Sequence, residues 1–427
     1  MKRLLFMAHR VPYPPDKGER VRAFHEIRVL SEHFRVTLAA LSHNRADDQS
    51  AGALNQWCEK VITAKAGGGL GLIRGGISLL GSRGITEGYF RTRRLERLLA
   101  EESRREPFDL VVAYCSSMLP YLLALSAPAR VMDLVDVDSA KWAAYAGSAG
   151  WPRSWLYRKE AKAVSALEQT AVDRCDAVIV VSPAEARVIG SQGDKVVAIG
   201  NGVDTEYFKP AGTNGDAGPP ALVFTGTMDY RPNVDGVCWF VREVWPRLKK
   251  RLPGLILQIV GRDPTAEVRK LARQPGVAVT GSVPDVRPYL ASAVAAICPL
   301  RIARGIQNKV LEAMAMGRAV IASPEALEGL ELRIGTDVLQ AATPDEWEGH
   351  VAALLDKPSF REGLESAARK CTVERYSWEA RLAPLVSLCR RLVGDRPGDE
   401  AGGQAGHRQT GQTNDSGERP SVEASLR

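Results

Sequence analysis

The chain has 427 residues, of which 45% are hydrophobic and 25% charged, a composition typical of a globular protein with about two to three domains. Its 57 Lys and Arg residues exceed its 50 Asp and Glu residues by too little to indicate a nucleic-acid-binding protein. Apolar runs fall short of the roughly 18 to 20 residues of a membrane span, and the seven cysteines are widely spaced. We therefore expect a cytoplasmic protein with reduced thiols, neither secreted nor membrane-spanning.

Short β-branched or apolar segments alternate with segments of helical periodicity along almost the whole chain. In chain order, the expected strands are residues 4–8, 36–41, 110–113, 131–134, 177–181, 196–199, 221–224, 255–260, 277–280, 294–298 and 319–322. This alternation predicts an α/β fold whose parallel sheets are covered by helices on both faces.

A Gly- and Pro-rich connection divides this pattern into two halves of Rossmann-like size. We predict a first domain over residues 1–200, a linker over 201–220 and a second domain over 221–374. Residues 394–427 are rich in Gly, Gln, Ser and Thr without periodicity, which predicts a disordered tail. Because open α/β sheets bind ligands beyond the carboxyl ends of their strands, two facing domains of this kind predict a cleft.

Several common catalytic motifs are missing from the sequence. It contains neither GxGxxG nor GxSxG, and it has no Gly-Lys dipeptide, so a dinucleotide fold, a nucleophile elbow and a P-loop are disfavoured. Asp136-Val137-Asp138 has the spacing of a metal-binding Asp-x-Asp motif. The alternative is a polar cluster at the end of a strand, together with Asp133, Ser139 and Lys141, and we predict no metal site.

The segment 305–321 has the features of an anion-binding helix start. Asn308 is a favourable N-cap, the next eight residues are strong helix formers, and Gly317 suits the residue after the helix end. A loop that follows strand 294–298 and enters this helix would offer backbone N–H groups to an anion.

The side chains of the same segment suit a nucleoside diphosphate. Arg301, Arg304 and Lys309 place positive charge at the helix start. Glu312, one turn inside, could accept paired hydrogen bonds from vicinal hydroxyls such as those of a ribose. An ordinary surface helix with an acidic residue is the alternative.

Five sequence segments occur in the order seen in retaining glycosyltransferase family 4, which the chain resembles along its length apart from the tail. They are Asn201-Gly202-Val203-Asp204 with Phe208 and Pro210, Val223-Phe224-Thr225-Gly226, Ile259-Val260-Gly261, Val279-Thr280-Gly281-Ser282-Val283, and Lys309 to Ile321. Residues 12–22, 135–139 and 228–233 more narrowly resemble sugar transferases of bacterial exopolysaccharide and exosortase loci.

This resemblance implies the GT-B fold, with two facing Rossmann-like domains and a helix over residues 375–393 that crosses back to the first domain. It implies that the second domain binds a UDP- or GDP-linked sugar and the first a lipid-linked or glycan acceptor, without a required metal or other cofactor. The expected reaction is retaining sugar transfer in bacterial exopolysaccharide biosynthesis.

The resemblance also implies roles for individual residues. The diphosphate would be stabilised by Arg231, Arg304 and Lys309, the donor would further contact Glu312, Gly226, Asn308 and Gly305, and the sugar or acceptor would face Lys17, Gly18 and Asp138. The chain departs from the family pattern at four places. Arg304 replaces the first Glu of the usual Glu-x7-Glu pair, and Gly226-Thr227 stands where the family has Gly-Arg. Pro232 stands at the register of the usual Lys, and residues 113–117 lack the customary His.

Two other functions fit the same architecture. A sugar-nucleotide 2-epimerase would need acid and base residues at the sugar, and the six histidines form no clear pair in the sequence. A degenerate nucleotide-sugar-binding protein would also lack the first Glu.

Residues 67–105 are a candidate contact with an anionic membrane surface. They combine apolar residues over 67–90 with a cluster of arginines, a pairing that suits peripheral docking on the inner face of the plasma membrane. The alternative is a mobile loop that leads into a solvated amphipathic helix over residues 93–105.

Overall fold

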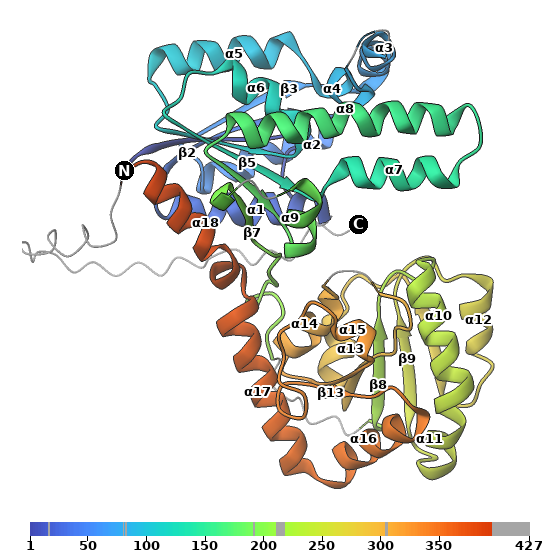
Figure 1. Cartoon of the computed structure of the whole chain (residues 1–427). Helices are drawn as coiled ribbons and strands as arrows, with labels where there is room; N and C mark the ends of the chain where they lie inside the picture. The colour runs from blue at the N-terminus through green and yellow to red at the C-terminus, as the bar shows by residue number, and fades with distance from the viewer. Residues whose placement is uncertain are drawn as a thin grey trace, which may run out of the picture. The chain divides into compact units, whose positions relative to one another are not determined.

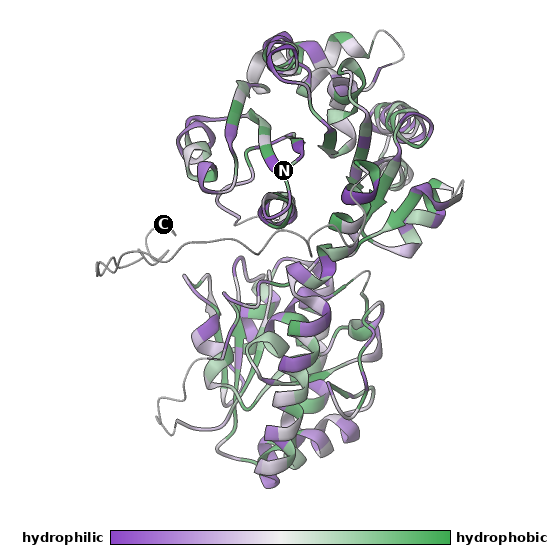
Figure 2. Ribbon diagram, turned by 90° about the vertical axis from the view of Figure 1, so that its left-hand side faces the viewer, coloured by the Kyte–Doolittle hydropathy of each residue, from purple (hydrophilic) through white to green (hydrophobic). Residues whose placement is uncertain are grey.

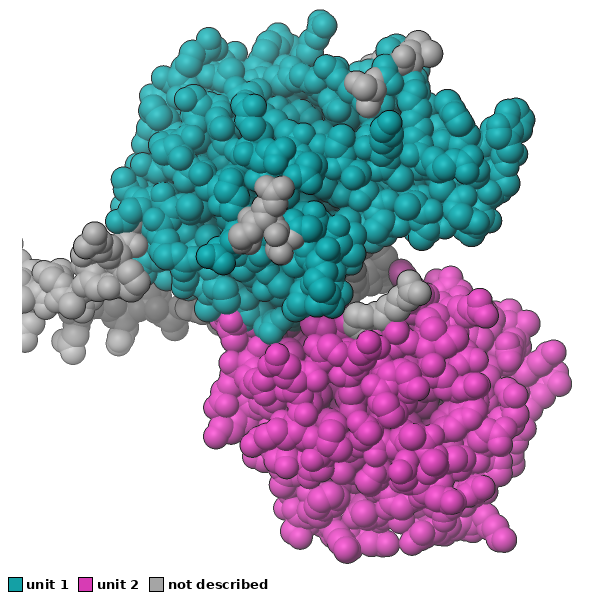
Figure 3. Space-filling view, viewed as in Figure 1, with its two compact units in different colours: residues 1–202, 381–405 teal, residues 203–380, 406–427 magenta. Residues whose placement is uncertain are grey.

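Two parallel β-sheets organise the chain (Figure 1). The computed structural model describes residues 1–15, 18–79, 81, 83–190, 193–210, 218–303 and 306–394. Within them, the first unit comprises Met1–Gly202 and the segment from Arg381 onward, and the second unit runs from Val203 to Ala380 (Figure 3). The predicted tail lies outside the described residues apart from Gly394.

The first unit contains a seven-stranded sheet in the order β3-β2-β1-β4-β5-β6-β7, with every pair parallel. Its strands are β1 (Arg3–Ala8), β2 (Arg35–Ser42), β3 (Lys60–Lys65), β4 (Leu110–Tyr114), β5 (Ala129–Val135), β6 (Ala177–Val180) and β7 (Val196–Ala198). β1 and β4 are buried along their whole length, so both faces of the sheet centre are covered. The hydrophobic residues accordingly gather on the strands (Figure 2).

The helices of the first unit fill the connections between these strands. They are α1 (Gly18–Ser31), α2 (Arg45–Ser50), α3 (Gly68–Ser78), α4 (Ile85–Phe90), α5 (Arg93–Arg105), α6 (Leu119–Ala124), α7 (Asp138–Ser148), α8 (Arg153–Arg174) and α9 (Pro183–Ile189), with 3-10 turns at Ala51–Gln56, Ser116–Met118 and Gly193–Lys195. A last helix, α18 (Trp378–Leu392), completes this unit, and its Leu382, Leu385 and Cys389 side chains are fully buried.

The second unit contains a six-stranded parallel sheet in the order β10-β9-β8-β11-β12-β13. Its strands are β8 (Ala221–Thr225), β9 (Ile256–Val260), β10 (Val277–Gly281), β11 (Ala295–Cys298), β12 (Ala319–Ala322) and β13 (Leu339–Gln340). Its helices are α10 (Arg231–Trp239), α11 (Trp245–Arg251), α12 (Ala266–Leu271), α13 (Arg287–Ser292), α14 (Asn308–Ala315), α15 (Pro324–Leu327), α16 (Pro344–Asp356) and α17 (Pro358–Tyr376), and a π-helical segment, Phe240–Val244, joins α10 to α11. The prediction of two Rossmann-like parallel-sheet domains is therefore confirmed.

Each sheet has a point where the strand order reverses, and that point locates a binding crevice. In the second unit the reversal lies between β8 and β11, and in the first unit it lies between β1 and β4. Ligands of open α/β sheets bind beyond the carboxyl ends of the strands at such points. The residues that follow β8 and β11, and those that follow β1 and β4, are therefore the first places to look for function.

None of the described helices is both long and apolar enough to cross a membrane.

Candidate functional site

Two glycines shape the crevice at the reversal point of the second unit. Gly226 follows β8 and Gly261 follows β9, with φ angles of 153° and 156°. A Cβ atom added at Gly261 would lie 1.6 Å from the carbonyl oxygen of Gly226, and one added at Gly226 would lie 2.8 Å from Nδ2 of Asn233. Only residues without a side chain let the two backbones approach this closely.

Lys309 reaches this crevice from the first turn of α14. Its Nζ donates a hydrogen bond to Oδ1 of Asn233 at 2.5 Å, and Nδ2 of Asn233 donates to the carbonyl of Thr227 at 2.9 Å. The ammonium also lies 4.8 Å from the ring centroid of Phe224. Burial lowers the pKa of Lys309, although Cys298 and Glu312 favour its charged form. Its hydrogen-bond partner is a neutral amide, which leaves the positive charge available to an anion.

Asn233 is a site residue that the sequence analysis missed. It is buried in the first turns of α10, and its side chain positions the Lys309 ammonium beside Gly226. Asparagine is a poor former of helix interiors. Its place at the start of the helix that follows β8 and Gly226 is the signal that could have found it.

Glu312 lies one turn inside α14, where burial raises the pKa of its carboxyl to about 7 and Lys309 acts in the opposite direction. The side chain keeps some exposure, but the helix and core around it remove most of the water from the carboxylate. The surroundings of Glu312 thus differ from those of an ordinary surface acid, the alternative given for this helix. Its carboxyl is poised to change charge near neutral pH.

The start of α14 differs by one residue from the expected cap. Gln307 precedes the helix in an extended conformation as its N-cap, without a side-chain hydrogen bond to the helix, and Asn308 is the exposed first helical residue. Asn308 therefore does not cap the helix. Its backbone belongs to the group of N–H donors that a helix N-terminus leaves open.

The remaining predicted cations are spread over two elements. Arg231 is exposed at the first residue of α10, where the loop after Gly226 enters the helix. Arg301 lies 3.7 Å from Asp235 of α10 in an ion pair. Arg304 and Gly305 fall outside the described residues. The structure thus brings together Gly226, Lys309 and Glu312 of the predicted donor site.

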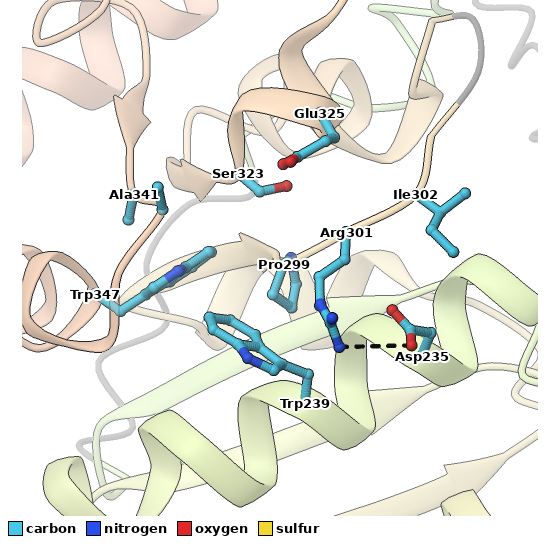
Figure 4. Close-up of a pocket in the computed structure, with 10 residues that line it drawn as sticks. Asp235, Trp239, Pro299, Arg301, Ile302, Ser323, Glu325, Ala341 and Trp347 are labelled. Atoms are coloured by element: carbon cyan, nitrogen blue, oxygen red, sulfur yellow. Dashed lines mark ion pairs between the residues drawn. The ribbon is translucent and has the colours of Figure 1, made fainter.

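A separate hollow of about 400 Å³ lies beyond the carboxyl ends of β11, β12 and β13 (Figure 4). It is lined by Asp235, Trp239, Pro299, Arg301, Ile302, Ser323, Glu325, Ala341, Ala342 and Trp347. Neither Lys309 nor Glu312 lines it, so this hollow is distinct from the crevice at Gly226.

Two of the predicted acceptor-side residues, Gly18 and Asp138, are the first residues of helices in the first unit. Lys17 lies outside the described residues, and Gly18 is the exposed first residue of α1 with open space beside it. Nζ of Lys141 forms ion pairs with Asp138 at 3.4 Å and with Asp136 at 2.6 Å.

Within the part of the chain that the structure describes, no group of three or more His, Cys, Asp and Glu side chains is arranged to hold a metal.

Asp133 does not join the ion pairs of Lys141. It is fully buried and accepts hydrogen bonds from Arg22 at 2.8 and 3.0 Å, and the same guanidinium donates to the carbonyl of Ile199. Because the aspartate pairs with an equally buried arginine, its role is to fix α1 against β5 and the end of the first unit. A polar cluster of Asp133 with Lys141 was therefore a wrong expectation.

The structure brings together two histidines that the sequence does not pair. His9 follows β1, His43 follows β2, and Nε2 of His43 lies 2.9 Å from the carbonyl oxygen of His9. Burial, with smaller effects of Arg10 and His43, lowers the pKa of His9 to about 3, so its ring is neutral at physiological pH. The two residues are 34 positions apart, and only the pairing of β1 with β2 brings them together.

Family models match both halves of the chain. Residues 18–207 match the family described as Glycosyltransferase Family 4, and residues 219–357 match the family described as Glycosyl transferases group 1. A comparison with curated proteins found no match.

Solved glycosyltransferases share the fold over nearly the whole chain. Sucrose-phosphate synthase from Thermosynechococcus elongatus is 16% identical, with a TM-score of 0.59 over 92% of this chain and 99% of that chain. A glycosyltransferase from Rickettsia africae is 12% identical, with a TM-score of 0.62 over 92% and 100%. HepE from Anabaena, solved in complex with UDP, is 14% identical, with a TM-score of 0.58 over 91% and 100%. The chain is therefore a glycosyltransferase of the family 4 type, built on the GT-B fold.

Proposed function

We propose that this enzyme transfers a sugar, with retention of anomeric configuration, from a UDP- or GDP-linked donor to a lipid-linked or polysaccharide acceptor in bacterial exopolysaccharide biosynthesis. The observation that carries the proposal is the ammonium of Lys309, held beside Gly226 at the strand reversal of the second unit. Structures of HepE with UDP and with UDP-glucose, which share the fold, support a nucleotide sugar as the donor.

Charge development during transfer explains why a cation belongs at this position. As the bond between the anomeric carbon and the nucleoside diphosphate breaks, negative charge grows on the leaving phosphate and the sugar ring becomes oxocarbenium-like. Lys309 and the open N–H groups of α14 would face that phosphate, with Arg231 contributing from the start of α10. Preorganised positive charge of this kind lowers the barrier because it matches the transition state better than the ground state.

Glu312 would bind the ribose of the donor. It lies three residues after Lys309 on α14, and adjacent positions of this spacing share a helix face. An ionised carboxylate has two oxygens that can accept the paired hydrogen bonds of vicinal hydroxyls. No metal is required in this arrangement, since cations of the protein face the diphosphate.

A screen of nucleotide sugars tests the proposal directly. The purified enzyme is incubated with UDP- and GDP-sugars and a polyprenyl-phosphate-linked or polysaccharide acceptor, and release of nucleoside diphosphate is measured with and without EDTA. The proposal expects acceptor-dependent release from one donor, unchanged by EDTA, and a product that keeps the anomeric configuration.

Other outcomes would identify the competing functions. Interconversion of the donor sugar without transfer would indicate an epimerase, and donor binding without any product would indicate a degenerate binding protein. Inversion at the anomeric carbon would contradict the retaining reaction.

A further inference from the structure

Helix α3 carries its large apolar side chains on its solvent face. Leu72, Ile73 and Ile77 are 60–66% exposed. The opposite face packs on α4 through glycines: a Cβ added at Gly75 would lie 3.0 Å from Ile85, and one added at Gly71 would lie 3.2 Å from Tyr89. A surface helix normally buries its apolar side and exposes its polar side. In α3 the apolar side chains face solvent and glycines face the protein, which leaves an apolar face without a partner in the described chain.

The turn between α7 and α8 exposes aromatic side chains. Trp151, in this turn, is 85% exposed, and Tyr145 of α7 and Trp155 of α8 are more than half exposed. Trp142 and Tyr157 pack against each other between the two helices, with ring centroids 5.6 Å apart, and support the hairpin from inside. Figure 1 shows α7 and α8 as a long hairpin on the first unit. Exposed tryptophan at a protruding turn costs solubility unless something covers it.

The two surfaces are neighbours on the first unit. Lys159 of α8 donates a hydrogen bond from Nζ to the carbonyl of Leu79, which directly follows α3. The same Nζ lies 5.7 Å from the ring centroid of Trp155. Glu160 accepts hydrogen bonds from the backbone N–H groups of Ile85 and Thr86, at 2.6 and 2.9 Å. These contacts fix the end of α3 and the start of α4 on α8, one turn from Trp155.

The exposed charged side chains around the turn between α7 and α8 are all positive. Arg153, Arg158 and Lys162 of α8 are exposed, and Lys159 is partly exposed. The acid among them, Glu160, is buried and bonded to backbone N–H groups. The exposed face of this segment is therefore cationic as well as aromatic.

We propose that the outward face of α3 and the turn between α7 and α8 together dock the first unit on an anionic membrane, with Trp151 and Trp155 at the level of the lipid headgroups. Tryptophan favours this zone because its ring is apolar and its N–H is polar. Exposed Arg and Lys side chains attract anionic headgroups while their stems lie along apolar surface. The proposal deepens the proposed function, on which it rests for a lipid-linked acceptor, and it adds the hairpin to the region 67–105.

The residue types of the hairpin favour a membrane over a glycan. Carbohydrate sites combine aromatic rings with side-chain amides and carboxylates that bind hydroxyls. From residue 141 to residue 159 the sequence contains no Asp, Glu, Asn or Gln. The segment therefore offers stacking and positive charge but lacks the carboxylates and side-chain amides that commonly bind sugar hydroxyls.

The experiment measures binding of the full chain to phosphatidylcholine vesicles with and without phosphatidylglycerol, by sedimentation at low and high salt. The proposal expects binding that needs phosphatidylglycerol and weakens with salt. The double variant Trp151→Ser/Trp155→Ser should bind about tenfold or more weakly, because it removes two partly inserted aromatic side chains. Phe360→Ser, at an exposed aromatic residue of the second unit, is the matched control and should bind as the wild type does.

Two further measurements separate this proposal from its alternatives. Tryptophan fluorescence should be quenched by vesicles of brominated lipid, and Trp151→Phe should lose a large part of that quenching. Unchanged vesicle binding or quenching in these variants would overturn the proposal. A wild type that does not bind vesicles, but dimerises or binds glycans through this surface, would also overturn it.

UDP and GDP binding, measured by calorimetry without vesicles, reports on the proposed function independently. The double variant should bind nucleotide normally. A wild type that binds neither nucleotide would contradict the donor assignment and leave the vesicle result to stand alone.

Discussion

Lys309 is a partly buried cation whose ammonium is held in place by a neutral side chain. Its hydrogen-bond partner, Asn233, carries no charge, and the ring of Phe224 interacts with the ammonium through its π face. A carboxylate partner would hold the ammonium as firmly but would repel a diphosphate. The amide therefore positions the charge and leaves it free to act on an anion.

Replacing Lys309 by Ala should slow transfer by about 10²- to 10³-fold at saturating donor, with a smaller change in KM, because the phosphate charge that it faces grows in the transition state. Steady-state kinetics with the donor found in the screen would measure both. Arg231→Ala should act in the same direction. A raised KM with unchanged kcat in both variants would mean that they bind the ground state only.

The raised pKa of Glu312 leads us to expect that donor binding depends on pH. With its pKa raised to about 7 by burial, the carboxyl is mostly protonated at pH 6 and mostly ionised at pH 8. The ionised form accepts both ribose hydrogen bonds, so donor affinity should rise by up to about tenfold across this range. Glu312→Gln, which cannot ionise, should bind more weakly and show a flat profile. A falling affinity, or the same rise in Glu312→Gln, would exclude this assignment.

At the level of elements, the sequence predicted most strands because a strand buried on both faces is a continuous apolar run. β3 was missed since Lys60 and Lys65 stand at its two ends on the edge of the sheet, where charges are common and the apolar run is short. The start of α14 was predicted to within one residue. The contact of His9 with His43 and the support of Lys309 by Asn233 could not be predicted, because both depend on the spatial order of the strands.

Two glycine substitutions in the second unit should have opposite effects on stability, because only Gly261 lies where two backbones approach closely. Gly261→Ala should destabilise the second unit severely, since its Cβ would overlap the carbonyl oxygen of Gly226. Gly349→Ala, in α16 with open space around it, should stabilise the protein by about 0.5–1 kcal/mol. Thermal unfolding of both variants checks this pair, and equal effects would show that the close approach of the two loops is not required.

For the whole molecule, the last helix decides whether the first unit is complete. Leu382, Leu385 and Cys389 of α18 are buried in that unit, although they lie far from it in sequence. A chain that ends at Tyr376 should therefore lose stability in the first unit and keep a folded second unit. Hydrogen exchange would show increased exchange in β1 and α1 and unchanged protection in β8 and β9. Loss of protection in both units would mean that they do not fold separately.

The discontinuous first unit also sets the order in which the protein can mature during synthesis. Domains usually fold as they leave the ribosome, the N-terminal one first. Here the second unit, from Val203 to Ala380, is a single continuous stretch, whereas the part of the first unit that packs on Leu382, Leu385 and Cys389 stays uncovered until α18 has been translated. The unit that is made first would thus be completed last, and the apolar surface that α18 covers would be open to chaperones while the second unit is being translated.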